Sequence, residues 1–233
     1  MAKIIMFGNQ KGGVGKSLCT VITATAYSQA PFNLRVTVAD VDPQKSIMSA
    51  RKYDLRRYDT PAPFDVVACS VSDFQRQAQQ LDDDNDLVII DAAGKLDADL
   101  PVKQQEISKT LMYVDCLFIP FVAGAFNFEA TYNYLQFVQK IQQIRAGSGR
   151  PLQVFGFVNM FRQRSVRDRY LADDMNELKK RAGLQIMKTG LNYYALFADA
   201  DTYESLYTPD TFDTAKLNVL AWLNEISKVC KIT

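Results

Sequence analysis

The residues with the clearest chemistry lie in a glycine-rich segment near the start of the chain, residues 10–17 (QKGGVGKS). Glycines there allow backbone N–H groups to turn inward around phosphate oxygens, and a helix that begins at this point adds the positive end of its dipole. Lys16 is placed to neutralise β- and γ-phosphates, and the hydroxyl of Ser17 is placed to bind Mg²⁺. The segment therefore predicts a phosphate-binding loop (P-loop) that uses ATP and Mg²⁺.

This loop departs from the usual pattern GxxxxGK[ST], because Gln10 stands where the first glycine is expected. A second lysine, Lys11, follows directly, and its ammonium would lie close to the triphosphate. We expect the nucleotide to contact one continuous run of residues: Lys11, Gly12, Gly13, Val14, Gly15, Lys16, Ser17 and Leu18.

Three carboxylates come at the ends of two predicted strands. Asp40 and Asp42 lie in residues 38–44 (VADVDPQ), and Asp91 follows the apolar residues 87–90. The carboxyl ends of strands in an open α/β sheet meet at one edge, where ligands bind, so Asp91 is expected to hold Mg²⁺ there. Asp40 and Asp42 stand two residues apart where the earlier of these two strands ends. Alternatively, these two aspartates only close the strand and cap the next helix.

The composition excludes several classes of catalyst. The chain has no histidine, which rules out Ser-His-Asp, Cys-His and HExxH chemistry. Its four cysteines lie far apart without a CxxC pair, as buried or free thiols in a reducing compartment do. Catalysis must therefore come from carboxylates, lysines, backbone amides and a metal. The net charge of +1 gives no strong overall field, so nucleic-acid binding would need a local patch.

Apolar runs alternate with helical patterns along the 233 residues, which predicts an α/β fold with a mostly parallel, twisted sheet covered by helices on both faces. The predicted strands are Lys3–Phe7, Arg35–Ala39, Phe64–Ala68, Leu87–Ile90, Cys116–Phe121 and Leu152–Val158. The predicted helices are Lys16–Gln29, Gln44–Arg51, Val71–Gln80, Gln104–Met112, Glu129–Ile144, Val166–Arg181 and Asp213–Lys228. Without an interdomain linker or an internal repeat, residues 1–233 are expected to form a single domain.

An acidic run at residues 82–86 (DDDND) raises the alternative of a metal site. Before a buried strand, such a run is more typical of a solvated loop. We therefore expect these residues to be exposed.

In its second lysine the loop resembles the deviant Walker A class, the ParA/MinD family of P-loop ATPases. In that family this lysine, Lys11 here, reaches across a dimer interface to the partner's nucleotide and acts as an arginine finger would. Residues 38–44 resemble the family's DxDPQ element, and residues 87–91 are similar to a Walker B strand. The resemblance covers most of the chain in strand order and is sharp at residues 8–18, 38–46 and 87–94.

The resemblance implies further roles. Asp42 would position or activate the attacking water, Asp40 would lie near the Mg²⁺ shell, and Asp91 would hold the metal through water. Gly94 would offer an N–H to the γ-phosphate, although residues 92–94 (AAG) depart from the family pattern. Asn159 would contact adenine; alternatively, it is only an asparagine in a turn at the end of a strand. Leu18 stands where relatives often carry a hydroxyl, which would remove one α-phosphate contact.

Only ten residues precede Lys11, so an N-terminal helix-turn-helix is not expected, and the resemblance favours the short ParA type. Such a protein is a slow ATPase that forms a homodimer with ATP, binds double-stranded DNA without sequence preference and drives plasmid or mobile-element partition. A centromere-binding partner protein would stimulate hydrolysis. The expected location is cytoplasmic and nucleoid-associated in the ATP-bound state.

A candidate DNA surface in residues 162–181 has seven basic and four acidic residues; its proposed contacts are Arg162, Arg164, Arg167, Lys179 and Lys180. A solvated charged helix explains these residues equally well.

Two other classes stay open from the sequence. A MinD-like or polar-localisation ATPase would position a cargo other than DNA, but the C-terminal residues 227–233 contain few bulky apolar side chains for a membrane anchor. An ATP-dependent small-molecule synthetase would leave no motif for its substrate pocket.

Overall fold

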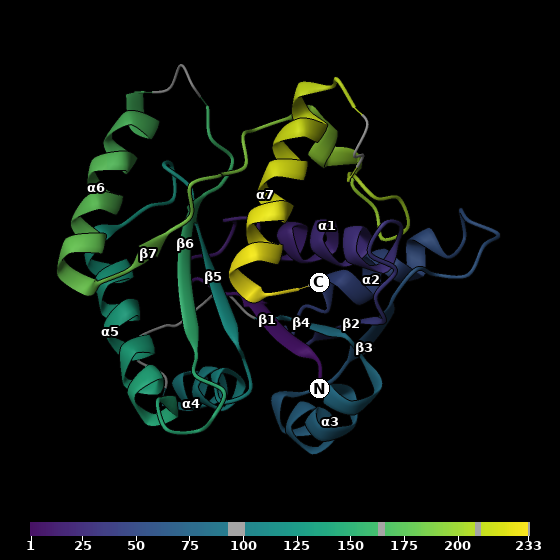
Figure 1. The fold of residues 1–233 in the computed structure, drawn as a ribbon, viewed down its shortest axis with the longest axis horizontal. Coiled ribbons are helices and arrows are strands. Elements are labelled where there is room, and N and C mark those ends of the chain that lie inside the picture. Colours follow the sequence, from purple (N-terminus) through teal and green to yellow (C-terminus); the bar gives the residue numbers. More distant parts are fainter. Residues whose placement is uncertain (93–100, 163–165, 208–210, 233) are drawn as a thin grey trace.

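The sheet has seven strands in the order β3-β2-β4-β1-β5-β6-β7, and every strand pair is parallel in the part of the chain described (Figure 1). This computed structural model describes residues 1–92, 101–162, 166–207 and 211–232. The strands are β1 Lys3–Phe7, β2 Val36–Asp40, β3 Asp65–Ala68, β4 Leu87–Asp91, β5 Cys116–Phe121, β6 Gln153–Val158 and β7 Gln185–Ile186. The predicted α/β class with a parallel sheet is confirmed.

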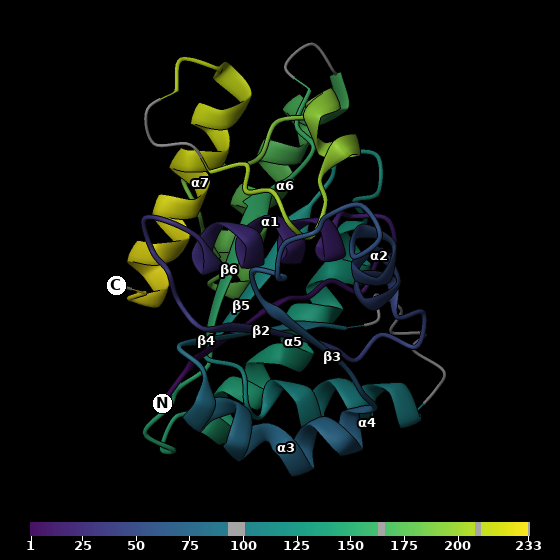
Figure 2. The ribbon, with the colours of Figure 1, turned by 90° about the vertical axis from the view of Figure 1, so that its right-hand side faces the viewer.

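Helices cover both faces of this sheet, as predicted (Figure 2). Ile4 and Met6 of β1 point into one apolar cluster, and Ile5 and Phe7 point into the other, because side chains alternate along a strand. The first cluster is completed by α3 Val71–Asp84, α4 Pro101–Leu111, α5 Phe128–Arg145 and α6 Val166–Ala182. The second is completed by α1 Lys16–Ser28, α2 Ser46–Asp54 and α7 Thr214–Cys230.

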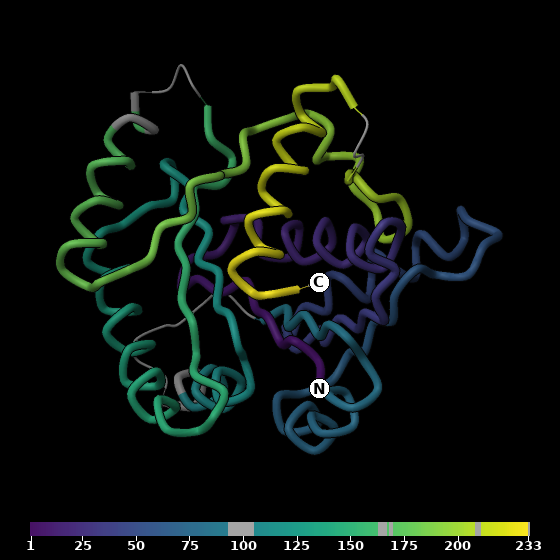
Figure 3. Tube along the Cα trace, in the orientation of Figure 1, coloured from purple at the N-terminus to yellow at the C-terminus, as the bar shows by residue number. Residues whose placement is uncertain are grey.

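The last helix is held over β1 by aromatic packing. Trp222 of α7 is fully buried, and its ring centroid lies 5.8 Å from that of Phe7 and 5.4 Å from that of Phe157. This burial of large rings fixes α7 on the same face as α1. Val219, Leu223 and Ile226 of α7 are also buried, whereas Leu217 is 42% exposed. The chain ends near its start, with residues 1–3 and 229–232 lining one cavity (Figure 3).

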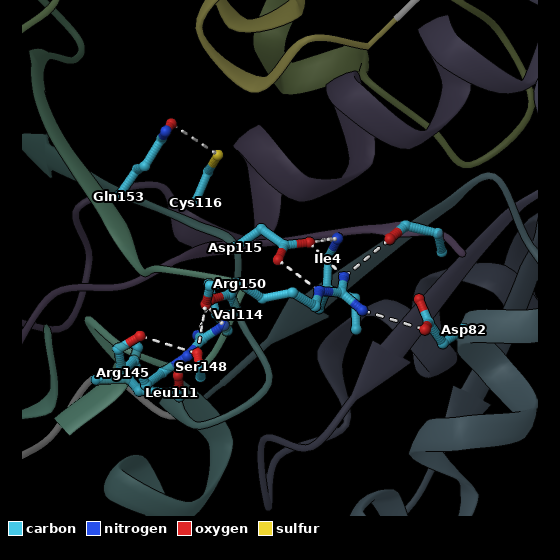
Figure 4. A network of polar contacts seen from close by, with 11 residues as sticks. Ile4, Asp82, Leu111, Val114, Asp115, Cys116, Arg145, Ser148, Arg150 and Gln153 are labelled. Carbon is cyan, nitrogen blue, oxygen red and sulfur yellow. Dashed lines mark hydrogen bonds and ion pairs between the residues drawn. The ribbon is translucent and has the colours of Figure 1, made fainter.

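A polar network ties the amino ends of the strands together (Figure 4). The guanidinium of Arg150 donates to both carboxylate oxygens of Asp115, at 2.9 and 2.6 Å, to Asp82 at 3.1 Å and to the carbonyl of Ala2 at 2.9 Å. Asp115 Oδ2 also accepts from the backbone N–H of Ile4 at 2.9 Å. The start of β1, the start of β5 and the end of α3 therefore share one cation.

This network corrects the prediction of a solvated loop at residues 82–86. Asp82 is only 6% exposed, and residues 82–84 belong to α3, which continues four residues past its predicted end. Asn85 is buried as well and accepts from the Thr37 hydroxyl at 2.8 Å. The prediction was wrong for Asp82 and Asn85, whereas Asp83, Asp84 and Asp86 are exposed as expected. Asp82 is buried because Arg150, far away in the sequence, supplies its counter-charge.

The predicted strand boundaries agree with the structure to within one residue, while the two-residue β7 and the 3₁₀ helix η1 Ala195–Asp199 were not predicted. All four cysteines are buried free thiols, as expected. Within the described ranges, no helix combines the length and apolar character needed to cross a membrane.

Candidate nucleotide-binding site

The glycine-rich loop joins the carboxyl end of β1 to the start of α1 at Lys16. Gly13 and Gly15 adopt φ angles of 73° and 84°, a left-handed conformation that side chains disfavour. A Cβ on Gly15 would also lie 2.6 Å from the amide nitrogen of Asn159. Glycine is thus required at this point both by the backbone angle and by the close approach of β6.

Asn9 braces the loop from below, and its role was missed by the sequence analysis. Its side-chain nitrogen donates to the carbonyl of Pro120 in β5 at 2.7 Å, while its side-chain oxygen accepts from the backbone N–H of Lys11 at 3.0 Å. An asparagine that accepts from a backbone N–H two residues later is a recognised turn former, so its place just before the loop was an available signal. Asn9 therefore links the backbone of Lys11 to the neighbouring strand.

Asn159, at the end of β6, braces the same loop from another side. Its amide donates to the carbonyl of Val14 at 2.8 Å, its oxygen accepts from the N–H of Met160 at 3.0 Å, and the residue is only 1% exposed. The structure thus gives this side chain a loop contact of its own. Its contact with adenine stays a prediction.

The two lysines of the loop occupy different environments. Lys16 is buried, with 8% exposed, and its ammonium donates to the carbonyl of Lys11 at 3.4 Å. Burial lowers the pKa of Lys16, while the nearby Asp91 and Asp42 oppose that change. Lys11 is exposed, and its ammonium forms no hydrogen bond or ion pair with the described residues. One cation therefore faces the phosphate site and the other faces outward.

Ser17 and Asp91 meet where Mg²⁺ was predicted. The Ser17 hydroxyl donates to Asp91 Oδ2 at 2.8 Å, and Asp91 is fully buried with no partner for Oδ1. Burial raises the pKa of Asp91 to about 7, and Asp40 and Asp42 add to this effect. A buried carboxylate with a free oxygen beside a hydroxyl fits Mg²⁺, which binds few protein oxygens and takes its other ligands from phosphates and water. No cluster of three or more acidic, Cys or His side chains able to hold a metal occurs in the described ranges.

β2 ends at Asp40, and Asp42 follows it in the turn that leads to α2. Asp40 is fully buried, and its Oδ2 accepts from the N–H of Met48 in α2 at 3.0 Å while its Oδ1 has no partner. Asp42 is half-buried, and its carboxylate accepts from the N–H of Gln44 at 2.8 Å. Asp40 thus caps α2, and Asp42 lies in the turn beside the loop.

The structure therefore gathers the loop residues, Asp40, Asp42, Asp91 and Asn159 at the carboxyl edge of the sheet. Leu18 packs its side chain against the apolar cluster under α1 and α7. Gly94 and Arg164 lie outside the described residues. The remaining predicted DNA contacts are exposed, on α6 and just before it: Arg162, Arg167, Lys179 and Lys180.

Residues 5–206 match the model of the CobQ/CobB/MinD/ParA nucleotide binding domain. The chain belongs to this family. The predicted relationship to ParA and MinD is thereby confirmed, and with it a nucleotide-binding domain. No curated protein matches the sequence.

Solved structures with the same fold have several functions. A protein of Borrelia burgdorferi B31 described as a plasmid partition protein, bound to AMPPNP, is 18% identical with a TM-score of 0.68, covering 98% of this chain and 99% of that one. Cobyrinic acid a,c-diamide synthase of Mycobacterium smegmatis, with ADP and magnesium, is 16% identical at 0.68, covering 99% and 96%. A substituted form of McdA from Cyanothece, in complex with ATP, is 14% identical at 0.67, covering 100% and 97%. At these identities the likeness shows the shared fold.

Proposed function

We propose that residues 1–233 form one ParA-type ATPase domain that switches between a monomer and an ATP-bound homodimer. The contrast between the two lysines carries this proposal. Lys16 is buried against its own loop, whereas the exposed Lys11 has a braced backbone and an ammonium without a partner among the described residues of its own subunit. With its backbone held in place and its ammonium unpaired within the described part of its own subunit, Lys11 is suited to contact the nucleotide of a second subunit.

In this proposal each residue has a separate task. The backbone N–H groups of Gly12, Gly13 and Gly15 surround the phosphates, and Lys16 neutralises them. Ser17, and Asp91 through water, would hold Mg²⁺, which would neutralise charge on the phosphates when bound. Asp42 orients the attacking water.

Lys11 of the partner subunit stabilises charge that develops at the β/γ bridge, so dimerisation completes the site. Hydrolysis then removes the γ-phosphate that both subunits contact, and the dimer separates. Because the site is complete only in the dimer, we expect slow turnover that a centromere-binding partner protein stimulates.

The dimer would bind duplex DNA without sequence preference and so act in partition of a plasmid or other mobile element. This keeps the ATP-bound form on the nucleoid in the cytoplasm. The family match and the partition protein among the structures of the same fold support the proposal.

Binding to a random-sequence duplex, with Mg²⁺ and either ATP or ADP at two salt concentrations, tests this function. We expect binding only with ATP, weakening steeply with salt because counterions are released from the phosphates that the protein contacts. ATP hydrolysis without DNA binding under either nucleotide would contradict the partition role and leave an ATPase with another cargo or substrate.

A further inference from the structure

The end of α2 carries a basic and aromatic surface that neither the loop nor α6 contains. We define the α2 patch as Lys52, Tyr53, Arg56 and Arg57. All four residues are exposed, Tyr53 by 62%. Lys52 and Arg56 form no ion pair with any described residue. Arg57 lies 3.8 Å from one carboxylate, that of Asp54, and its guanidinium lies 5.8 Å from the centre of the Tyr53 ring.

The opposite side of the same segment is anchored in the protein. Arg51 is buried and donates to the hydroxyl and the carbonyl of Thr202, at 2.9 and 3.1 Å. Asp54 is also buried and accepts from the N–H and hydroxyl of Thr202, at 2.9 and 2.8 Å. Tyr58 donates to Asp201 at 2.5 Å and stacks on Tyr203 with 4.5 Å between ring centroids. The backbone that carries the α2 patch is therefore held in place by residues 201–203.

This anchoring buries the Asp54 carboxylate, which still lies 3.8 Å from the Arg57 guanidinium. The Asp54 carboxylate faces inward to Thr202, while Lys52, Arg56 and Arg57 face solvent. Among residues 52–59 the exposed charged groups are these three cations and the carboxylate of Asp59. The patch thus offers an excess of positive charge in which every side chain can donate a hydrogen bond to a phosphate oxygen.

At its other end, α2 begins in the nucleotide site. Asp40, beside Asp91 in the paired strands β2 and β4, accepts from the N–H of Met48 at 3.0 Å. The hydroxyl of Ser46, the first residue of α2, lies 3.4 Å from the hydroxyl of Ser17. One nine-residue helix therefore connects the phosphate loop to the patch.

Two of the cations near α6 have partners, whereas Arg167, Lys179 and Lys180 are exposed. The Arg162 guanidinium lies over the Tyr193 ring, 4.1 Å from its centre, and Arg181 forms an ion pair with Glu177 at 2.6 Å. The segment joining α2 to β3 projects at the right-hand edge of Figure 1, and α6 forms the left-hand edge. The two surfaces can therefore be tested separately.

We propose that the α2 patch contacts the phosphate backbone of duplex DNA, and that α2 connects this contact to the nucleotide site. This inference rests on the proposed function and gives its DNA contact a location. Lysine, arginine and tyrosine all serve as phosphate contacts in protein–DNA complexes and carry no sequence preference there. An acidic protein is the competing occupant of such a surface.

The test is the salt dependence of binding to a random-sequence duplex, with Mg²⁺ and ATP, for the variant Lys52→Ala/Arg56→Ala/Arg57→Ala. The negative slope of log K against log salt should become less steep by about 2.7 when three phosphate contacts are lost. Between about 50 and 200 mM salt the wild type should then lose about 40-fold more affinity than the variant. ATP affinity should not change, since the exposed side chains do not contact the loop.

Two control variants also replace exposed cations but should leave the DNA contact intact. The variant Lys140→Ala/Lys188→Ala/Lys228→Ala removes the same charge from other positions and should keep the wild-type slope. The pair Arg56→Lys/Arg57→Lys keeps the charge of the patch and should also keep it.

An α2 variant that binds DNA with the wild-type slope would overturn the inference, while the proposed function would stand on the wild-type result. Loss of retention on immobilised polyglutamate together with an unchanged DNA slope would overturn it in favour of an acidic protein. A wild type that binds no DNA with ATP would instead refute the proposed function.

Discussion

Replacing Asn159 with alanine should weaken the binding of every nucleotide that uses the phosphate loop. The amide of Asn159 donates to the Val14 carbonyl at 2.8 Å in a position that is only 1% exposed. Without it, this carbonyl must lose its partner or the loop must relax until water reaches it. Nucleotide binding would then have to restore the loop against a free-energy difference of about 1–3 kcal/mol.

That difference corresponds to a loss of affinity between about 5-fold and about 140-fold, at about 1.4 kcal/mol for each factor of ten. Calorimetric titration of ATP, ADP and GTP with Mg²⁺ measures it. Because the amide acts on the loop, ATP and GTP should lose the same factor. Asn159→Asp keeps the shape but places an oxygen opposite the Val14 carbonyl, so its loss should be at least as large.

A loss confined to adenine nucleotides would refute this reasoning about the loop. It would show that Asn159 acts through the base, which is the role that the family resemblance implies. Thermal unfolding of each variant without nucleotide separates both results from a general loss of stability.

Three further changes test other parts of the site and fold. Lys16→Ala should abolish nucleotide binding, measured by the same titration; wild-type affinity in that variant would rule out the P-loop assignment. Asp42→Ala should keep ATP binding and dimerisation but stop phosphate release, and a monomer in ATP would remove its proposed role. Arg150→Met leaves Asp82 and Asp115 without a counter-charge, so the free energy of unfolding in urea should fall by about 3 kcal/mol. A fall of less than about 1 kcal/mol in the free energy of unfolding would contradict the network. Since Arg150 lies at the opposite edge of the sheet from the loop, the ATP affinity of the folded protein should not change.

The parts that sequence could predict are those set by local pattern. The apolar runs of residues 87–90 and 116–121 have no polar interruption because these strands are buried on both faces, and their positions were predicted closely. The phosphate loop was recognised because its lysine and glycines must have fixed spacing. Asp91 followed from the rule that parallel strands deliver their carboxyl ends to the same edge, whereas the roles of Asp40 and Asp42 came from the family resemblance.

What the sequence could not predict depends on partners far away along the chain. Asp82 is buried because of Arg150, and Asp54 and Arg51 are buried because of Thr202. No periodicity reveals such pairs. The braces of the loop are of the same kind: Asn9 reaches Pro120, and Asn159 reaches Val14, across 111 and 145 positions of sequence.

The most direct test of the switch is the mass of the protein in solution, measured by sedimentation velocity with Mg²⁺ and either ATP or ADP. The wild type should sediment with ADP as one 26.3 kDa chain and with ATP at twice that mass. Lys11→Ala should bind ATP but keep the mass of one chain, because the exposed lysine no longer contacts the second nucleotide. An equal mass with both nucleotides, or an ATP dimer that forms as well without Lys11, would contradict the proposed mechanism.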